Sequence, residues 1–243
     1  MKNKKWISLA AAVVLAVTAL PMGVFAAKKD GEEEKLTKVT LNEVAHSIFY
    51  APQYVAIEEG YFAEEGLDLT LVTGFGADKV LTALISGEAD IGFMGAEASI
   101  YAYQEGATDP AVNFAQLTQR AGNFLVAREE MPDFKWEDLK GKKVLGGRKG
   151  GMPEMVFEYI LRKNGLDPQK DLTINQSIDF GSTAAAFTGD ASADFTVEFE
   201  PSATALEKEG AGYVVASLGV DSGYVPYTSY SCLLYTSDAA DEL

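Results

Sequence analysis

Hydrophobic and polar residues follow two different periods along this chain. Short apolar runs with the two-residue period of a strand precede longer segments in which apolar residues recur every three or four positions, as on one helix face. In the first half this pattern predicts strands at 38–44, 67–74, 89–95, 111–119 and 123–129, and helices at 51–66, 77–88 and 96–106. Strands and helices that alternate at such short intervals favour a largely parallel sheet.

The same order of elements returns in the second half. After a short helix and strand in the run WEDLKGKKVLGG, the pattern predicts helices at 152–165, 182–190 and 200–210, and strands at 170–178, 193–199 and 212–219. Two pairs of similar segments support a repeat: EEGLDLTL resembles KNGLDPQKDLTI, and ISGEADIGFMG resembles FTGDASADFTVEF. In each of these segments a glycine follows the predicted helix, where it acts as a stop signal.

This repeat predicts an α/β protein of two lobes, each with a mainly parallel sheet flanked by helices. We place lobe 1 at 37–122 and lobe 2 at 123–225. Ligands of open parallel sheets bind beyond the carboxyl ends of the strands. Two such lobes that face each other should therefore form a ligand cleft from these edges.

The amino-terminal residues have the composition of a secretory signal peptide. A basic start with Lys2, Lys4 and Lys5 precedes an apolar run that ends at Leu20, so we expect a signal peptide at 1–26. A retained membrane anchor is the alternative, but the run is shorter than the roughly 20 residues that a span requires. Residues 27–36 read as an acidic linker.

The last residues follow neither period. The run CLLYTSDAADE (232–242) resembles the translation of a transposase sequencing adapter. We therefore expect 232–243 to be an artefact on a truncated gene, with a genuine tail as the alternative. Because the only cysteine, Cys232, falls in this run, we expect neither disulfides nor thiolate metal sites in the residues before it.

Charge and composition exclude several classes of function. The net charge of −16 repels nucleic acid and anionic lipid, although solubility alone would also explain it. A single histidine leaves only carboxylates as metal ligands, without the spacing of an EF-hand. The sequence has no Gly-x-Ser-x-Gly motif and no complete phosphate-binding loop, so we expect no catalytic residues, metal or cofactor.

Aromatic residues gather just past the first predicted strand, in HSIFYAPQY (46–54). His46 is a candidate donor to a ligand, or else a histidine bonded to backbone near the hinge. Phe49 and Tyr50 are candidates to stack on a planar ligand or to pack in the core. We assign Tyr50 to the cleft because its hydroxyl needs a polar partner.

Glycines mark the other strand ends. Gly76 and Phe180 are candidates in GFGAD and SIDFGS. In GGRKGGM (146–152), Gly150, Gly151 and Met152 precede a helix, where free backbone N–H groups can bind an anionic or carbonyl oxygen. A plain tight turn is the alternative.

Four glutamates fall at strand ends or in first helical turns. For Glu154 and Glu200, capping of the helix dipole is at least as good an explanation as ligand binding. We assign Glu97 and Glu198 to the cleft. A sulfonate would be repelled there, whereas an amine-bearing heterocycle such as an aminopyrimidine would be favoured.

The run FYAPQYVAIEEGYFAEEGLDLTL (49–71), the glycine and Ala-Asp of GEAD (87–90) and LKGKKV (139–144) carry a resemblance to a known family. Over residues 37–230 the chain resembles substrate-binding proteins of ABC importers, of the NitT/TauT (SsuA/ThiY-like) type. This resemblance implies a type II periplasmic-binding-protein fold, export to the outer face of the cell membrane and a monomer. It implies hinge closure over a small molecule (sulfonate, taurine, nitrate or a thiamine-precursor pyrimidine) and delivery to a membrane permease.

Two departures from the family are visible. Relatives return to lobe 1 after lobe 2, and here only 226–231 reads as the start of that return; the lipid-attachment cysteine of many relatives is also missing. A pyrimidine-synthesising enzyme of fungi shares the scaffold, but IGFMGAEASIYAY (91–103) lacks the lysine and histidine that it uses. That enzyme activity and a sensor module of a receptor remain the alternatives.

Overall fold

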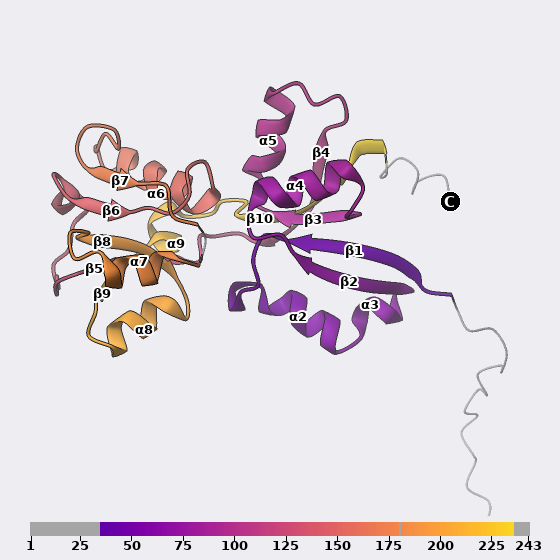
Figure 1. The fold of residues 1–243 in the computed structure, drawn as a ribbon, viewed down its shortest axis with the longest axis horizontal. Helices are drawn as coiled ribbons and strands as arrows, with labels where there is room; N and C mark the ends of the chain where they lie inside the picture. The colour runs from indigo at the N-terminus through magenta and orange to yellow at the C-terminus, as the bar shows by residue number, and fades with distance from the viewer. Residues whose placement is uncertain (1–34, 180, 236–243) are drawn as a thin grey trace, which may run out of the picture. The chain divides into compact units, whose positions relative to one another are not determined.

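Two five-stranded sheets organise the chain, one in its first half and one in its second (Figure 1). The computed structural model describes residues 35–179 and 181–235. The predicted signal peptide, most of the predicted linker, Phe180 and residues from 236 on lie outside the described residues. Both sheets belong to one compact unit that begins at Leu36.

The first sheet has the strand order β2-β1-β3-β10-β4. Strand β1 pairs in parallel with β2 and β3, whereas β10 pairs antiparallel with β3 and β4. Helices α2 and α3 lie on one face of this sheet and α4 and α5 on the other (Figure 1). The bounds are β1 (Thr37–Glu43), η1 (Ile48–Tyr50), α2 (Ala51–Glu58), α3 (Tyr61–Glu64), β2 (Leu67–Thr73), α4 (Ala77–Ser86), β3 (Ile91–Met94), α5 (Glu97–Gln104), β4 (Ala111–Thr118) and β10 (Thr228–Leu233).

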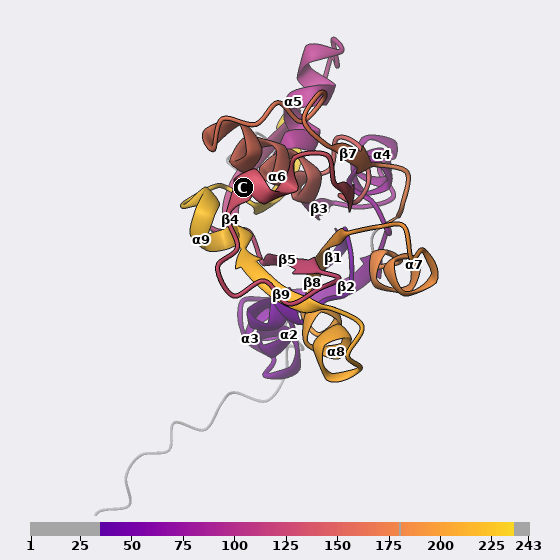
Figure 2. The same cartoon turned by 90° about the vertical axis from the view of Figure 1, so that its left-hand side faces the viewer.

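The second sheet has the strand order β7-β6-β8-β5-β9. Strand β6 is parallel to β7 and β8, and β5 is antiparallel to β8 and β9. Helices α6 and α9 cover one face and α7 and α8 the other (Figure 2). The bounds are β5 (Asn123–Ala127), η2 (Trp136–Leu139), β6 (Lys143–Leu145), α6 (Met152–Lys163), β7 (Thr173–Asn175), α7 (Thr183–Gly189), β8 (Phe195–Phe199), α8 (Ser202–Lys208), β9 (Tyr213–Ser217) and α9 (Leu218–Ser222).

The predicted α/β class is confirmed, but the sheets are mixed rather than mainly parallel. Strands β5 and β10 run antiparallel to both of their neighbours. Each follows a segment that crosses between the sheets instead of a helix that returns along the same sheet, so the alternating pattern does not mark its direction. The expected helix at 51–66 is divided at Gly60 (φ 78°), and α9 replaces the end of the strand expected at 212–219.

Each sheet buries its own apolar cores. In the second sheet, Phe157, Ile160 and Leu161 of α6 are fully buried against strand residues such as Leu125. Their spacing of three and four residues puts them on one helix face, as the sequence pattern predicts. In the first sheet Val80 and Leu84 of α4 pack with Met94.

Two crossover segments, 118–122 and 223–228, connect the sheets and lie side by side. The Tyr227 N–H donates to the Thr118 carbonyl (3.1 Å), and the Val225 N–H donates to the Gln119 carbonyl (3.1 Å). The guanidinium of Arg120 lies 4.2 Å from the centre of the Tyr224 ring. The chain thus passes between the sheets along a short paired ribbon.

Strand β10 extends into the run that the sequence analysis assigns to an adapter artefact. Cys232 and Leu233 pair with Val112 and Ala111 of β4, while residues from 236 on lie outside the described part. Within the residues that the structure describes, no helix has the length and apolar character needed to cross a membrane.

Candidate functional site

A cavity of about 640 Å³ is lined by residues from both sheets. Its wall includes residues of loops and helix starts that follow the carboxyl ends of the parallel strands: Val44 and Tyr50 after β1, Gly76 after β2, Gly95, Glu97 and Ala98 after β3, and Gly146 to Pro153 after β6. Thr183 of α7, Val197 and Phe199 of β8, and the crossover residues Tyr227 and Thr228 also line it. We call this space the inter-sheet cavity; it lies where open parallel sheets place their ligands.

Six of the candidate residues from the sequence analysis line this cavity. They are Tyr50, Gly76, Glu97, Gly150, Gly151 and Met152. Three others, His46, Phe49 and Glu198, are not part of its wall. Phe180 lies outside the described residues.

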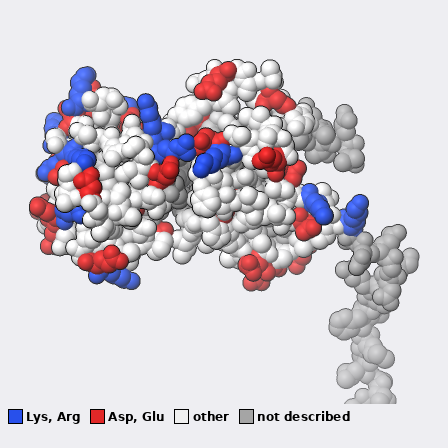
Figure 3. Space-filling view, in the orientation of Figure 1, with Lys and Arg blue, Asp and Glu red and all other residues white. Residues whose placement is uncertain are grey.

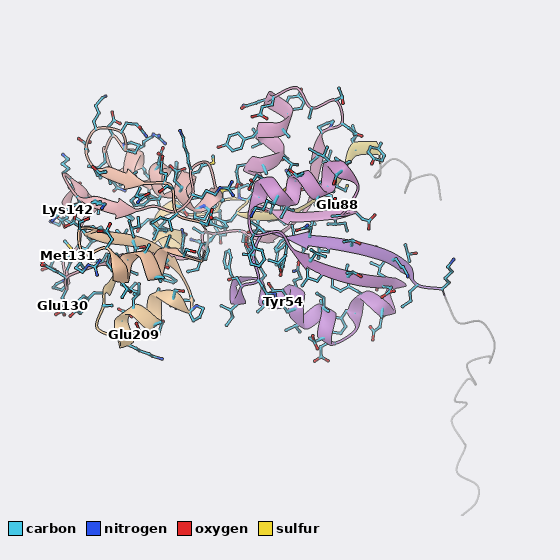
Figure 4. All side chains as sticks on the ribbon, viewed as in Figure 1. Tyr54, Glu88, Glu130, Met131, Lys142 and Glu209 are labelled. Carbon is cyan, nitrogen blue, oxygen red and sulfur yellow. The ribbon has the colours of Figure 1, made fainter. Side chains whose placement is uncertain are left out.

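His46 belongs to a polar network around Glu43 instead of the cavity wall. Its Nδ1 lies 2.9 Å from Glu43 Oε1, and its ring stacks on Tyr54 with centroids 4.4 Å apart. Glu43 is fully buried and also accepts hydrogen bonds from Tyr54 Oη (2.8 Å), Gln53 Nε2 (3.1 Å) and Thr73 Oγ1 (3.1 Å). Tyr54 is labelled beside α2 in Figure 4. The network joins the end of β1 to α2 and β2.

Phe49 packs where the two sheets meet. Its ring centroid lies 5.6 Å from those of both Phe199 and Tyr227. A Cβ on Gly122 would come within 2.3 Å of the Phe49 ring, so the crossover fits this side chain only with glycine at 122. Tyr50 is also buried, edge-on to Phe93, but lines the cavity.

Glu97 places a buried carboxylate in the cavity wall at the start of α5. Only 4% of the residue is exposed, and Oε1 accepts the backbone N–H of Met152 at the start of α6 (3.0 Å). A Cβ on Gly95 would lie 1.9 Å from Glu97 Oε2, so the side chain folds over a glycine. Burial raises the pKa of the Glu97 carboxyl to about 7.

The glycine-rich loop before α6 already uses its backbone donors. The N–H groups of Lys149, Gly150 and Gly151 donate to Gln176 O (2.9 Å), Glu154 Oε2 (3.2 Å) and Arg148 O (3.2 Å). Because the Met152 N–H donates to Glu97, the four donors from 149 to 152 are all taken. The loop is therefore a capped turn in this structure, with Glu154 in the capping role that the sequence allowed.

Glu198 is buried beside the cavity and orients one residue of its wall. It accepts hydrogen bonds from Thr183 Oγ1 (3.0 Å) and Thr196 Oγ1 (2.7 Å), and Thr183 lines the cavity. Burial raises its pKa to about 7. Glu200 accepts from the backbone and hydroxyl of Thr204, as a capping residue of α8 would.

Contacts between the two sides close the rim of the cavity. The Arg148 guanidinium donates to both carboxylate oxygens of Asp78, at 2.9 Å each. Tyr101 Oη lies 3.0 Å from Met155 Sδ. In Figure 3, basic and acidic side chains meet over the boundary between the two sheets. Together with the bond from Met152 to Glu97, these contacts join α4 and α5 to the start of α6.

The three buried glutamates predict how stability depends on pH. Burial raises the pKa of Glu97, Glu154 and Glu198 to about 7. The folded chain therefore holds these protons to higher pH than the unfolded chain does, so the free energy of unfolding should fall as pH rises from about 5 to 8. Urea unfolding across this range measures the slope.

The variant Glu198→Gln serves as the control for this slope. It removes one of the three titrating groups, so the fall in stability with pH should shrink by about a third. A slope that is unchanged in this variant would show that the fall arises from general repulsion of the acidic chain.

The described residues contain no group of three or more His, Cys, Asp or Glu side chains arranged to hold a metal ion. The polar part of the cavity wall instead consists of backbone groups, tyrosine hydroxyls and the side chains of Asp78, Glu97, Glu105, Arg148, Lys149, Thr183 and Thr228. This arrangement can bind a molecule through hydrogen bonds and apolar contact.

Known structures with similar folds show to which fold class the chain belongs. The periplasmic aliphatic sulphonate binding protein SsuA of Escherichia coli superposes with a TM-score of 0.65 at 20% identity, over 84% of this chain and 68% of that one. The periplasmic nitrate-binding protein NrtA of Synechocystis PCC 6803 gives 0.66 at 18% identity, over 84% and 57%. The Candida albicans CA3427 product, described as having the generic periplasmic binding protein fold, gives 0.62 at 13% identity, over 85% and 67%. The chain has the fold of the periplasmic binding proteins.

The family is shown by the sequence itself. The chain belongs to the NMT1/THI5-like family, whose model matches residues 48–240. It is 50% identical over 226 residues to a protein of Bacillus subtilis (strain 168) named "Putative binding protein YtlA", covering 93% of this chain and 66% of that protein. The chain thus spans just under two thirds of that relative's length. The resemblance predicted from the sequence motifs is confirmed.

Proposed function

We propose that the chain is the solute-binding component of an ABC importer. It would capture a small molecule in the inter-sheet cavity and deliver it to a membrane permease. The observation that carries this proposal is the cavity itself, because about 640 Å³ lies within the range typical of small-molecule sites. Family membership and the binding-protein fold support it. Export to the outer face of the membrane and a monomeric state are parts of the proposal.

The proposed mechanism is a hinge at the two crossover segments, with lobes at 37–122 and 123–225 and the return at 226–231. Two connections between lobes restrict the motion to closure and opening. The contacts that join α4 and α5 to α6 stabilise the closed arrangement. Among the sequence candidates, the ligand-facing residues would be Tyr50, Gly76, Glu97, Gly150, Gly151 and Met152.

Calorimetric titration tests this function. The purified chain is titrated with alkanesulfonates, taurine, nitrate and aminopyrimidines, the ligand classes that the family resemblance suggests. We expect one class to bind with one molecule per chain. The absence of heat with every member would contradict the proposed function.

The rim pair between Arg148 and Asp78 gives a prediction about closure. Arg148→Ala removes a bidentate bond between the two sides, but both side chains are about half exposed, so the pair contributes roughly 0.3–1 kcal/mol to closure. Ligand affinity should fall about two- to fivefold, with a nearly unchanged unfolding midpoint. Titration and thermal unfolding measure the two quantities.

The matched control is Arg162→Ala, which removes an exposed arginine whose partner Glu158 lies on the same helix. This variant should leave the affinity unchanged. Equal affinities for the two variants would show that the rim pair does not stabilise the closed form.

A further inference from the structure

Two buried oxygen atoms in the cavity wall lack a hydrogen-bond partner. Within the described residues, the buried side-chain atoms without a partner belong to Asn42, Glu97, Thr118, Asn123 and Tyr227. Of these residues only Glu97 and Tyr227 line the inter-sheet cavity. Their free atoms are Glu97 Oε2 and Tyr227 Oη, in residues that are 4% and 3% exposed. An unsatisfied buried polar atom costs about 1–3 kcal/mol, so a partner from outside the chain would stabilise this wall.

Among the residues that the structure describes, no cationic side chain pairs with Glu97. None of the ion pairs among the described residues includes it. The two cationic side chains that line the cavity, Arg148 and Lys149, are exposed at its rim, and Arg148 is bonded to Asp78. The cavity wall at Glu97 and Tyr227 therefore has an acceptor character without a paired positive charge.

The backbone N–H groups at the start of α6, which would bind an anion, already have hydrogen-bond partners. The start of a helix binds anions through free N–H groups, but in α6 the Met152 N–H is bonded to Glu97 and the preceding Gly150 N–H to Glu154. An anionic ligand would have to displace a carboxylate from these donors and lie beside it. A molecule that brings its own donors would leave both bonds intact.

The other residues of the cavity wall favour a ligand with a compact, apolar part. Tyr50, Tyr101, Phe199 and Tyr227 contribute aromatic surface, and Met152 contributes a flexible thioether. Aromatic walls of this kind bind planar groups by stacking and edge contacts. The N–H donor of the ligand would therefore be attached to a planar ring.

We propose that the ligand is a planar, neutral or cationic molecule whose amino or amidinium N–H groups donate to Glu97 Oε2 and Tyr227 Oη, and that anions are excluded from this end of the cavity. This inference rests on the proposed function and narrows it to one class of solute.

Head-group titrations test the inference. The donor probes are benzamidine, cytosine and adenine, and the anionic probes are benzenesulfonate, benzoate, taurine and nitrate. At least one donor probe should bind to the chain by calorimetry, and the anions should not. In Glu97→Gln the affinity for that donor probe should fall at least tenfold, while Glu88→Gln, which alters an exposed acid that does not line the cavity, should leave it unchanged.

The pH dependence gives a second readout. With a pKa of about 7 in the free protein, the Glu97 carboxyl is roughly one tenth ionised at pH 6 and nine tenths ionised at pH 8. The affinity for the amidinium of benzamidine should therefore be about tenfold weaker at pH 6 than at pH 8, and independent of pH in Glu97→Gln.

The phenols near Glu97 do not titrate in this range, whereas one neighbouring carboxyl, Glu154, does. The phenols of Tyr50, Tyr101 and Tyr227 interact with it, and burial raises the pKa of each, that of Tyr50 to about 12. The next carboxyl on the α6 side, Glu154, is turned to Gly150. Glu154 has a pKa of about 7 as well, so the flat profile of Glu97→Gln is the control that assigns the pH effect to Glu97.

The outcomes separate the two proposals. Binding of an anionic probe without any donor probe, or donor binding that is unaffected by Glu97→Gln, would overturn the inference and leave the solute-binding function in place. No binding of any probe of either series would count against both. Far-UV circular dichroism of Glu97→Gln verifies that the variant is folded, and Tyr227→Phe, expected to weaken donor binding severalfold, gives an independent measure of the same subsite.

Discussion

Phe157→Ala is expected to lower the free energy of unfolding by about 3–5 kcal/mol, the range for removing a fully buried phenylalanine. Phe157 lies on the inner face of α6 and has no exposed surface. It packs within the largest apolar cluster, beside Trp136 at a centroid distance of 6.3 Å. Loss of the ring leaves a cavity between α6 and the second sheet, which urea unfolding followed by circular dichroism measures as a lower midpoint.

A neighbour on the same helix provides the control. Tyr159 is 48% exposed, so Tyr159→Ala should change the unfolding free energy by less than about 1 kcal/mol. A similar loss for both variants would mean that α6 does not present the face described here. Because α6 also supplies Met152 to the cavity wall, Phe157→Ala should weaken ligand binding indirectly.

Glu43→Ala is expected to have a comparable effect for a different reason. Its carboxylate is fully buried and accepts hydrogen bonds from Tyr54, Gln53 and Thr73 as well as His46. Truncation leaves buried donors without an acceptor, at about 1–3 kcal/mol for each donor that water cannot reach. We expect a loss of roughly 3 kcal/mol or more, again by urea unfolding.

His46→Ala tests whether the network is structural or ligand-binding. The His46 side chain is 67% exposed, so its removal should cost much less than the removal of Glu43. Ligand affinity should be unchanged in His46→Ala, because the residue does not line the cavity. A large loss of affinity would return His46 to the set of ligand residues.

Local patterns predicted the elements well because their signals are local. The apolar face of α6 lies where the pattern expects it, and the strands that follow the Gly-Leu-Asp and Ala-Asp segments lie within three residues of their expected bounds. The sequence did not predict that β10 runs antiparallel to its neighbours, since its direction depends on where a crossover enters the sheet between β3 and β4. The sequence of this six-residue strand, which follows the second lobe, does not indicate which strands it pairs with.

In the candidate site, too, the sequence predicted residues with local signals and missed those that depend on distant segments. Residues directly after parallel strands, such as Glu97 and Gly150, line the cavity as a rule about strand ends predicts. Tyr227 was missed because it reaches the wall through the crossover ribbon, paired with Thr118 more than a hundred positions earlier. His46 was misplaced because the strand-end rule gives its position but not the partner, and its ring turns to Glu43.

The free donors expected in the glycine-rich loop were also misjudged. The sequence shows that glycines precede a helix, but not that Glu97 of the other sheet, 55 positions away, accepts the Met152 N–H. Together with the bonds made by Lys149, Gly150 and Gly151, this long-range bond occupies the backbone donors before α6, which is why we propose a ligand that brings its own donors.

A crystal structure of the chain with the probe that binds in calorimetry tests the central claim most directly. The account predicts the probe within the inter-sheet cavity, in contact with residues of both sheets and with its N–H group in hydrogen-bond distance of Glu97 Oε2. A probe bound on the outer surface of either sheet, with the cavity filled only by water, would contradict it.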